Sequence, residues 1–439
     1  MNYTTALDIG ERKRRQGGIN EDSVAVTLLE EGHRDTERTS AVFVVADGAG
    51  GTQAGDIASY VATVEVSRRL TDRLWRERLL SEAAGAVGAE GRGRNGHALE
   101  LTDGVVGDPL ADASDETVQT VIERAIQAAH TRIVRVIGDL DLDSAYTTVV
   151  VAVVAGDRLH YGWVGDSRAY LVNLGDRDDD QRVTRLTSDH SEVERLLEQG
   201  AIDEVEAHVH RRSNRITRAL GGTRTEDPAA SSIEVDTASV PLYADDVLLL
   251  TSDGLIDAFT GAPRLHREYE EADDTDAVRE RILERAVTDD EIGDVVAGAE
   301  SLSAAADRFV DLSNDRGGKD NLSIVLARDE SLPESPAGHL PIRTYDPEPE
   351  EVAEWETVKQ FPADDAADDP ADLESPGDSP PDPVEVDDAS GPDDEASAGR
   401  ERAEESTTHI DGRPGDPAAD APDEQSDDGS DAGGAGTGR

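Results

Sequence analysis

Five apolar runs of strand length limit the folds that this chain can adopt. Each is rich in β-branched or other apolar residues and is short enough to be one strand. The runs cover residues 42–46, 147–155, 164–172, 247–251 and 322–327. Helical patterns lie between them at residues 52–80, 118–137, 191–199 and 304–312. Many strands with few long helices predict an α+β domain in which helices cover a sheet.

The chain divides into two parts by composition. Residues 1–330 carry all five apolar runs and are predicted to form one globular domain, with insertions at about 81–115 and 262–300. Residues 331–439 are rich in Pro, Asp, Glu, Ala and Gly and hold 32 acidic but only 6 basic residues. Because such a composition cannot form an apolar core, we expect this acidic tail to be mostly disordered.

The whole chain is strongly acidic, with a formal net charge of −55 and only three lysines. Binding to nucleic acid or to an anionic membrane requires many Lys and Arg side chains, so we expect neither partner. Self-repulsion at this charge opposes a compact state unless salt screens it. The composition therefore predicts a protein from a salt-adapted organism; the simpler alternative is an ordinary acidic protein.

The chain contains no cysteine, which excludes disulfides, thiolate catalysis and cysteine-based zinc sites. Its first residues lack the charged-then-apolar pattern of a signal peptide. No apolar run approaches the roughly 18 residues that a membrane helix needs. We therefore expect a cytoplasmic protein.

Three aspartates lie at the ends of apolar runs. Asp47 follows the run at 42–46, Asp253 follows the run at 247–251, and Asp320 precedes the last run. An Asp-Gly pair after a strand is by itself a common turn signal, and acids are frequent in this chain, so each aspartate alone is weak evidence. A carboxylate held beside buried surface needs a partner, however, and a divalent cation is an efficient one.

Together with the acids of residues 20–23, these aspartates predict a site for hard cations. Mg²⁺ and Mn²⁺ favour oxygen ligands and retain several waters. Two such cations can share a carboxylate, lower the pKa of a water that bridges them and bind a phosphoryl oxygen. A hydrolase of this kind needs no nucleophilic side chain.

Seven short motifs then occur in a fixed order. They are Asn-Glu-Asp-Ser (20–23), Asp-Gly-Ala-Gly-Gly (47–51), Gly-Asp-Ser-Arg (165–168), Leu-Thr-Ser-Asp-His-Ser (186–191), Ile-Thr-Arg-Ala-Leu-Gly (216–221), Ser-Asp-Gly-Leu-Ile-Asp (252–257) and Lys-Asp-Asn-Leu-Ser (319–323). The series resembles the protein phosphatase 2C family, in particular its bacterial branch, over about residues 5–327. The resemblance implies a central β-sandwich of two antiparallel sheets flanked by helices, and metal-dependent hydrolysis of phosphoserine and phosphothreonine in proteins.

The resemblance also implies roles for individual residues at two main cation positions. Asp47 would bridge the two cations, and Asp253 and Asp320 would complete the first position. Glu21 and the backbone carbonyl of Gly48 would serve the second. These assignments make Asp47, Asp253 and Asp320 the central residues of the predicted site.

Four further residues match supporting positions of the family. Asp22 would hold cation-bound waters, and Asn321 would orient such a water or Asp320. Asp166 and Asp257 match a third, weaker cation position. Residues 191–214, called the flap below, match the variable flap that the family has beside its site.

The chain departs from the family at two positions. Ala49 stands where many animal members have a proposed proton donor, a histidine that bacterial-type relatives also lack. Gly17 stands where members usually have a phosphate-binding arginine. Because a guanidinium binds phosphate through a bidentate fork, we predict that Arg15 takes this role, with Arg14 in reserve. The alternative is that residues 12–15 form a solvated basic loop.

The departure at residue 17 leaves a second function open, that of a pseudophosphatase that binds phosphoproteins without hydrolysing them. Two other interpretations also remain. The acidic tail could bind basic partners, or the phosphatase could act on a phosphorylated regulator of transcription. The predicted partners are otherwise phosphorylated proteins, the targets of serine/threonine kinases.

Overall fold

A computed structural model describes residues 1–33, 36–49, 54–76, 114–175, 182–272, 274–338 and 340–345. Within these residues, two five-stranded antiparallel sheets pack face to face. The first has the order β1 (Asn2–Asp8), β13 (Leu322–Arg328), β12 (Asp246–Thr251), β8 (Arg168–Asn173), β9 (Val183–Arg185). The second has the order β11 (Asp236–Pro241), β7 (Arg158–Val164), β6 (Val149–Ala155), β3 (Thr36–Ala46), β2 (Ser23–His33). A small third sheet has the order β10 (Leu220–Thr223), β5 (Ser144–Thr147), β4 (Gly48–Ala49).

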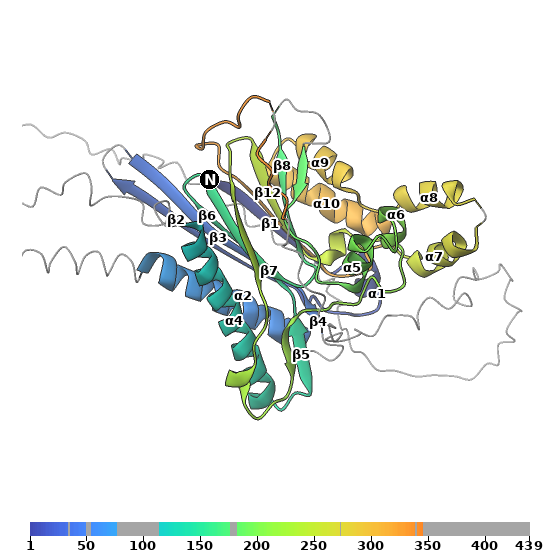
Figure 1. Cartoon of the computed structure of the whole chain (residues 1–439), viewed down its shortest axis with the longest axis horizontal. Helices are drawn as coiled ribbons and strands as arrows, with labels where there is room; N and C mark the ends of the chain where they lie inside the picture. The colour runs from blue at the N-terminus through green and yellow to red at the C-terminus, as the bar shows by residue number, and fades with distance from the viewer. Residues whose placement is uncertain are drawn as a thin grey trace, which may run out of the picture.

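Helices cover the outer face of each large sheet (Figure 1). Helices α2 (Gly55–Thr71) and α4 (Asp115–Asp139) pack on the β2–β11 sheet, and a short π-helix, η1 (Asp72–Arg76), follows α2. Helices α9 (Asp289–Ala297) and α10 (Leu302–Arg316) pack on the other sheet. The prediction of an α+β fold with a central antiparallel sandwich and helices on both sides is confirmed.

Strand β3 shows why the apolar runs have apolar residues at every position. Val42, Val44 and Ala46 pack beneath α2 and α4, whereas Phe43 and Val45 face the opposite sheet. Successive side chains of a strand point to opposite faces, and here both faces are covered. The run is therefore apolar at every position rather than at alternate ones.

The run at 164–172 is not one strand, as the sequence suggested, but two strands in different sheets. Strand β7 ends at Val164 and β8 begins at Arg168. Gly165 between them has φ +109, a conformation that residues with a Cβ rarely adopt, and a Cβ there would lie 2.6 Å from the side chain of Thr148. The chain crosses here from one sheet to the other, which leaves Asp166 at the end of the sandwich.

Helix α4 buries the predicted apolar face and begins one turn earlier than the pattern, because the side chain of Ser114 accepts a hydrogen bond from the Thr117 N–H as its N-cap. Helix α2 begins at Gly55, and residue 52, where the sequence predicts its start, lies outside the described residues. Residues 77–113 lie outside the described part of the chain, so the predicted insertion at 81–115 is largely outside it as well.

Contacts with the sandwich continue past the predicted domain boundary at residue 330. Arg343 is buried and donates to the buried Asp246 carboxylate over 2.6 Å, and the ring of Tyr345 packs edge-on against Trp163 with centroids 4.8 Å apart. These contacts hold residues 343 and 345 on the sandwich. Composition alone could not predict these contacts, because two anchoring side chains hardly change the average composition of a polar segment. The sequence predicts a mostly disordered tail from residue 331, and its residues 346–439 lie outside the described part of the chain.

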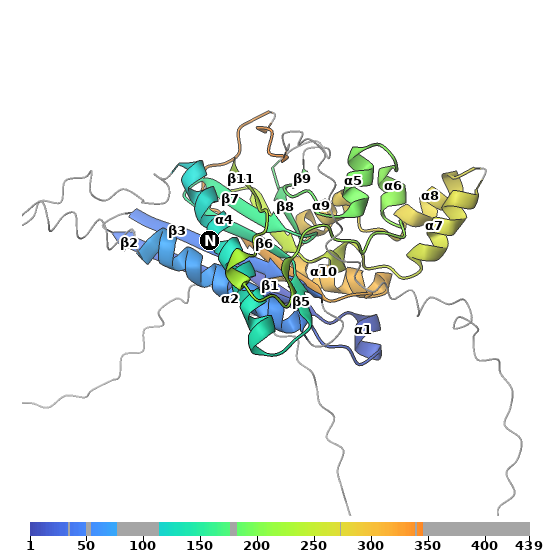
Figure 2. The same cartoon turned by 60° about the horizontal axis from the view of Figure 1, so that its bottom comes forward.

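A group of short helices lies together at one end of the sandwich (Figure 2). The flap contributes α5 (Glu192–Glu198) and α6 (Glu204–Ala207), and the region predicted as the second insertion contributes α7 (Ala262–Glu271) and α8 (Asp276–Leu283). Val205, Val209, Phe259, Leu265, Val278 and Ile282 form the small apolar core between them. Among the described helices, none is long and apolar enough to cross a membrane.

Candidate metal centre

The acids predicted from the sequence meet at one end of the two large sheets. Asp47 follows β3, and Asp253 follows β12 at the start of a 3-10 turn, η4 (Asp253–Leu255). Asp320 lies just before β13, and Glu21 lies just before β2. Strands from both sheets thus bring together carboxylates that are up to 299 positions apart in the sequence, as Glu21 and Asp320 are.

The carboxylates crowd one another: Asp22 and Asp166 are buried, and Asp47 and Asp253 are half-buried. Burial raises the pKa of Asp47 well above its usual value, and the negative charges of Asp22, Asp253 and Asp320 raise it further. Burial, with Asp320 and Asp257, raises the pKa of Asp253 to about 7. Burial likewise raises the pKa of Asp22 to about 6, although Ser323 donates to its Oδ2 over 2.8 Å. These shifts show charges held close together with too few positive partners.

Three buried carboxylate oxygens have no hydrogen-bond partner within the described structure. They are Oδ1 of Asp22, Oδ1 of Asp166 and Oδ1 of Asp253. Leaving such an atom unsatisfied costs free energy, and a divalent cation with its waters would satisfy it. An all-oxygen set of this kind suits Mg²⁺ or Mn²⁺. The residues present therefore fit divalent cations.

Two glycines allow the backbone to come this close. A Cβ on Gly48 would lie 2.5 Å from the Glu21 carbonyl oxygen and 2.2 Å from that of Gly55. A Cβ on Gly254 would lie 1.9 Å from the Asn321 carbonyl oxygen. Real Cβ atoms do not approach other atoms so closely, so the Gly of each Asp-Gly pair is required for the segments to meet.

Asn321 joins the segments around the centre. Its Oδ1 accepts from the Glu21 N–H over 2.9 Å, and its Nδ2 donates to the carbonyls of Ile9 and Ile19. Its own backbone N–H donates to Oδ1 of Asp320 over 2.7 Å. The sequence predicted that Asn321 orients Asp320 or a water. In the structure it also closes the loop between β1 and β2.

A lysine, rather than an arginine, reaches the acids. Nζ of Lys13 lies 2.6 Å from Oδ1 of Asp320, 2.9 Å from Oδ1 of Asn321 and 3.5 Å from Oε2 of Glu21. Burial disfavours the charged form of Lys13, but the attraction of Asp320, Asp47 and Glu21 outweighs burial and raises its pKa. Lys13 is therefore a basic side chain of this centre, in direct contact with Asp320.

Arg15, the residue that the sequence predicts to bind phosphate, contacts Glu11 rather than the acids of the centre. Helix α1 (Glu11–Arg15) places residues 11 and 15 on one side, where Arg15 is 75% exposed and bonds Glu11 over 2.6 Å. The reserve candidate, Arg14, bonds Asp8 over 2.6 Å. Lys13 is the middle residue of α1, and its side chain lies on the opposite side of the helix from Glu11 and Arg15. The sequence signal that would identify Lys13 is a helix that starts after Gly10.

The two residues predicted for a third cation lie beside Asp253. Burial raises the pKa of Asp166 well above its usual value, and so do the charges of Asp253, Asp189 and Asp257. Asp257 lies 3.9 Å from Nζ of Lys319. His190, a residue of the 186–191 motif, accepts from the Gly165 N–H over 3.0 Å and so fixes the loop that carries Asp166.

The raised pKa of Asp253 gives a stability prediction for the metal-free chain. A raised carboxyl pKa means that this group favours folding below its unfolded value of 3.8 and opposes it increasingly as pH rises through about 7. We expect Asp253→Asn to raise the midpoint of thermal unfolding in EDTA at pH 8, and to raise it less at pH 5. Thermal melts of both proteins at the two pH values measure this. An equal or reversed difference would contradict the crowding of charges described above.

Fold and site together define a metal-dependent hydrolase, with buried carboxylates at one end of a helix-flanked β-sandwich. The family model for protein phosphatase 2C matches residues 9–287. That match spans more than half of the chain, and the chain belongs to this family. PP2C-type phosphatases use divalent metals, in agreement with the chemistry of the acids.

Curated relatives are phosphatases as well. The serine/threonine phosphatase stp of Listeria welshimeri is 29% identical over 286 residues, which cover 65% of this chain and 83% of the relative. Among solved structures, the serine/threonine phosphatase PstP/Ppp of Mycobacterium tuberculosis is 24% identical with a TM-score of 0.48, covering 75% of this chain and 99% of that one. A catalytic domain of PstP in complex with two manganese ions is 23% identical with a TM-score of 0.43, covering 74% and 96%.

Proposed function

We propose that this chain hydrolyses phosphoserine and phosphothreonine monoesters in proteins with two divalent cations, Mg²⁺ or Mn²⁺. The observation that carries the proposal is the meeting of carboxylates from both sheets beside Lys13, three of them with a buried oxygen that has no partner among the described residues. Glu21, Asp47, Asp253, Asp320 and the Gly48 carbonyl would hold the cations. Asp166 and Asp257 would hold a third.

The cations, when bound, supply a water of lowered pKa and neutralise phosphoryl charge. The chain's own part is to position and to balance charge. Asp47 and Asp253 lie together at the ends of two strands, which would hold their carboxylates in place as cation ligands. Ala49 offers no proton donor, so water must protonate the leaving alkoxide.

Lys13 takes the role that the sequence assigned to Arg15. Its ammonium group lies among Asp320, Asn321 and Glu21, on a flexible four-carbon side chain. When cations satisfy these acids, Nζ is free to donate to a phosphoryl oxygen of the substrate. The pseudophosphatase alternative was supported only by the missing arginine at residue 17. Lys13 would supply a positive charge at the centre in place of that arginine.

The proposal predicts phosphate release from a phosphothreonine peptide by the full chain, in molar KCl with Mn²⁺ or Mg²⁺. We expect release to stop in EDTA, to resume when Mn²⁺ is restored, and to be much slower from a phosphotyrosine peptide. A malachite-green assay measures it. If the folded, Mn²⁺-bound chain released no phosphate, the binding-module alternative would stand instead.

We also propose that the chain works in a salt-rich cytoplasm on the targets of serine/threonine kinases. The support is its net charge of −55, which salt must screen, and the phosphatase family to which it belongs. The same charge is the reason to expect neither nucleic acid nor an anionic membrane as partner.

A further inference from the structure

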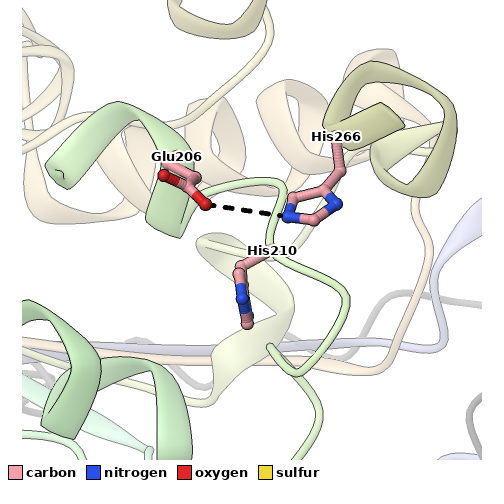
Figure 3. A group of neighbouring side chains, drawn as sticks. All are labelled: Glu206, His210 and His266. Carbon is pink, nitrogen blue, oxygen red and sulfur yellow. Dashed lines mark ion pairs between the residues drawn. The ribbon is translucent and has the colours of Figure 1, made fainter. Parts of the chain in front are cut away.

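A second cluster of metal-binding side chains lies where the flap meets α7. Glu206 belongs to α6, His210 to the turn after it, and His266 to α7. One ligand atom of each lies within 4.8 Å of the others. Figure 3 shows His266 directed at Glu206, with His210 beside them. The cluster shares no residue with the carboxylate centre.

His266 is the best defined of the three ligands. Its side chain is only 3% exposed, and its Nε2 has no hydrogen-bond partner within the described structure. Nε2 faces Oε1 of Glu206 at 3.8 Å, whereas Nδ1 faces Oε2 of Glu270, one turn along α7, at 3.6 Å. Both ring nitrogens of His266 therefore face a carboxylate oxygen beyond hydrogen-bond distance. In the neutral tautomer with the proton on Nδ1, the lone pair of Nε2 faces Glu206, and a cation placed between the two atoms would be attracted by both.

His210 completes the group from the flap. Its ring lies edge-on to that of His266, with centroids 5.1 Å apart and planes at 87°. It is buried, and its Nδ1 accepts one long hydrogen bond, 3.3 Å from the Arg212 N–H. A neutral imidazole has one free lone pair, so coordination through either nitrogen would replace this bond.

Two imidazoles and one carboxylate form the ligand set that Zn²⁺ and similar borderline cations prefer, whereas Mg²⁺ prefers oxygen alone. We propose that Glu206, His210 and His266 bind one divalent transition-metal ion of the Zn²⁺ class, with water as a fourth ligand. Tetrahedral coordination at about 2.0–2.1 Å would need the three ligand atoms, which lie within 4.8 Å of one another, to move inward.

Such an ion would fasten the flap to α7. Val205 and Val209 of the flap already pack against Leu265 there, but this apolar core is small. The other end of the flap reaches the carboxylate centre, because Oδ1 of Asn214 accepts from Nζ of Lys319 over 3.3 Å. The proposed ion is therefore a structural one that holds the base of the flap, and the proposal does not depend on phosphatase activity.

The test is Zn²⁺ binding to the full chain, stripped of metal and then saturated with Mg²⁺ so that the carboxylate centre is filled. Competition with a chromophoric chelator measures the affinity. We expect the natural chain to bind one Zn²⁺ tightly. His210→Gln and His266→Gln should each lower the Zn²⁺ affinity by at least about 100-fold, because loss of a ligand weakens metal binding more than loss of a ligand's hydrogen-bond partner. His208→Gln, a change in the same turn outside the cluster, should bind Zn²⁺ as the natural chain does.

Co²⁺ gives a second readout that does not depend on the folding of those variants. In the natural chain, Co²⁺ at this site should show the strong visible absorption of a tetrahedral complex, and Glu206→Gln, a change at a partly exposed side chain, should weaken it. Equal Zn²⁺ affinity in the His208, His210 and His266 variants would overturn the proposal. So would a natural chain that binds no Zn²⁺, or whose Co²⁺ spectrum is unchanged by Glu206→Gln.

Discussion

Asp253→Asn is expected to lower kcat/KM for a phosphothreonine peptide by at least about 10³-fold, a loss comparable to removing one key charge-stabilising group from an active site. Asn has nearly the same shape as Asp, so the sandwich keeps its packing. What is lost is one negative charge from a buried set in which Asp253 lies against Asp47 and near Asp320. Cation affinity and the positioning of the attacking water should both fall.

The kinetic comparison needs a matched acid elsewhere. Asp294 on α9 is 77% exposed, and its contact with Arg182 is on the surface. Asp294→Asn should therefore keep the natural rate in the same Mn²⁺ titration. Because Asp253→Asn is also expected to stabilise the metal-free fold, a loss of activity with an unchanged or higher melting temperature would assign the effect to the centre. Retention of a tenth or more of the natural kcat/KM would show that Asp253 is not a principal ligand.

Lys13→Ala is expected to lower kcat/KM by about 10²-fold, as expected when one donor to a developing charge is removed. The ammonium group of Lys13 is the basic group that contacts Asp320, at 2.6 Å, and a phosphoryl group bound beside Asp320 would meet it. Arg15→Ala removes a 75% exposed side chain that bonds only Glu11 among its described contacts, and should change kcat/KM by less than about twofold. Lys13→Arg should recover part of the activity, since a guanidinium also binds phosphate.

A second measurement separates a phosphate-binding role from a structural one. Lys13 and the cations compete for Asp320 and Glu21, so Lys13→Ala should bind Mn²⁺ more tightly even as it turns over more slowly. Calorimetric titration of the stripped protein with Mn²⁺ measures this. Weaker Mn²⁺ binding, or a large loss for Arg15→Ala with none for Lys13→Ala, would restore the assignment to the arginine.

Local patterns determined much of what is now seen. Apolar runs predict strands because a strand that is covered on both faces is apolar at every position, as in β3. The acids at the ends of these runs were identified because a charge next to buried surface is unusual and needs a reason. Helix α4 was predicted for the same kind of reason, since its buried residues Val118, Ile122 and Ile126 recur every four positions.

Only the tertiary structure decided which residues meet across the chain. Lys13 contacts Asp320 over 307 positions, and the choice of Lys13 over Arg15 depends on which side of a five-residue helix faces the acids. The turn at Gly165 moves the chain between sheets, and Arg343 reaches back 97 positions to Asp246. His266 meets Glu206 in the same way. Such contacts leave no periodic trace in the sequence, because they follow from the packing of whole elements rather than from the burial of one.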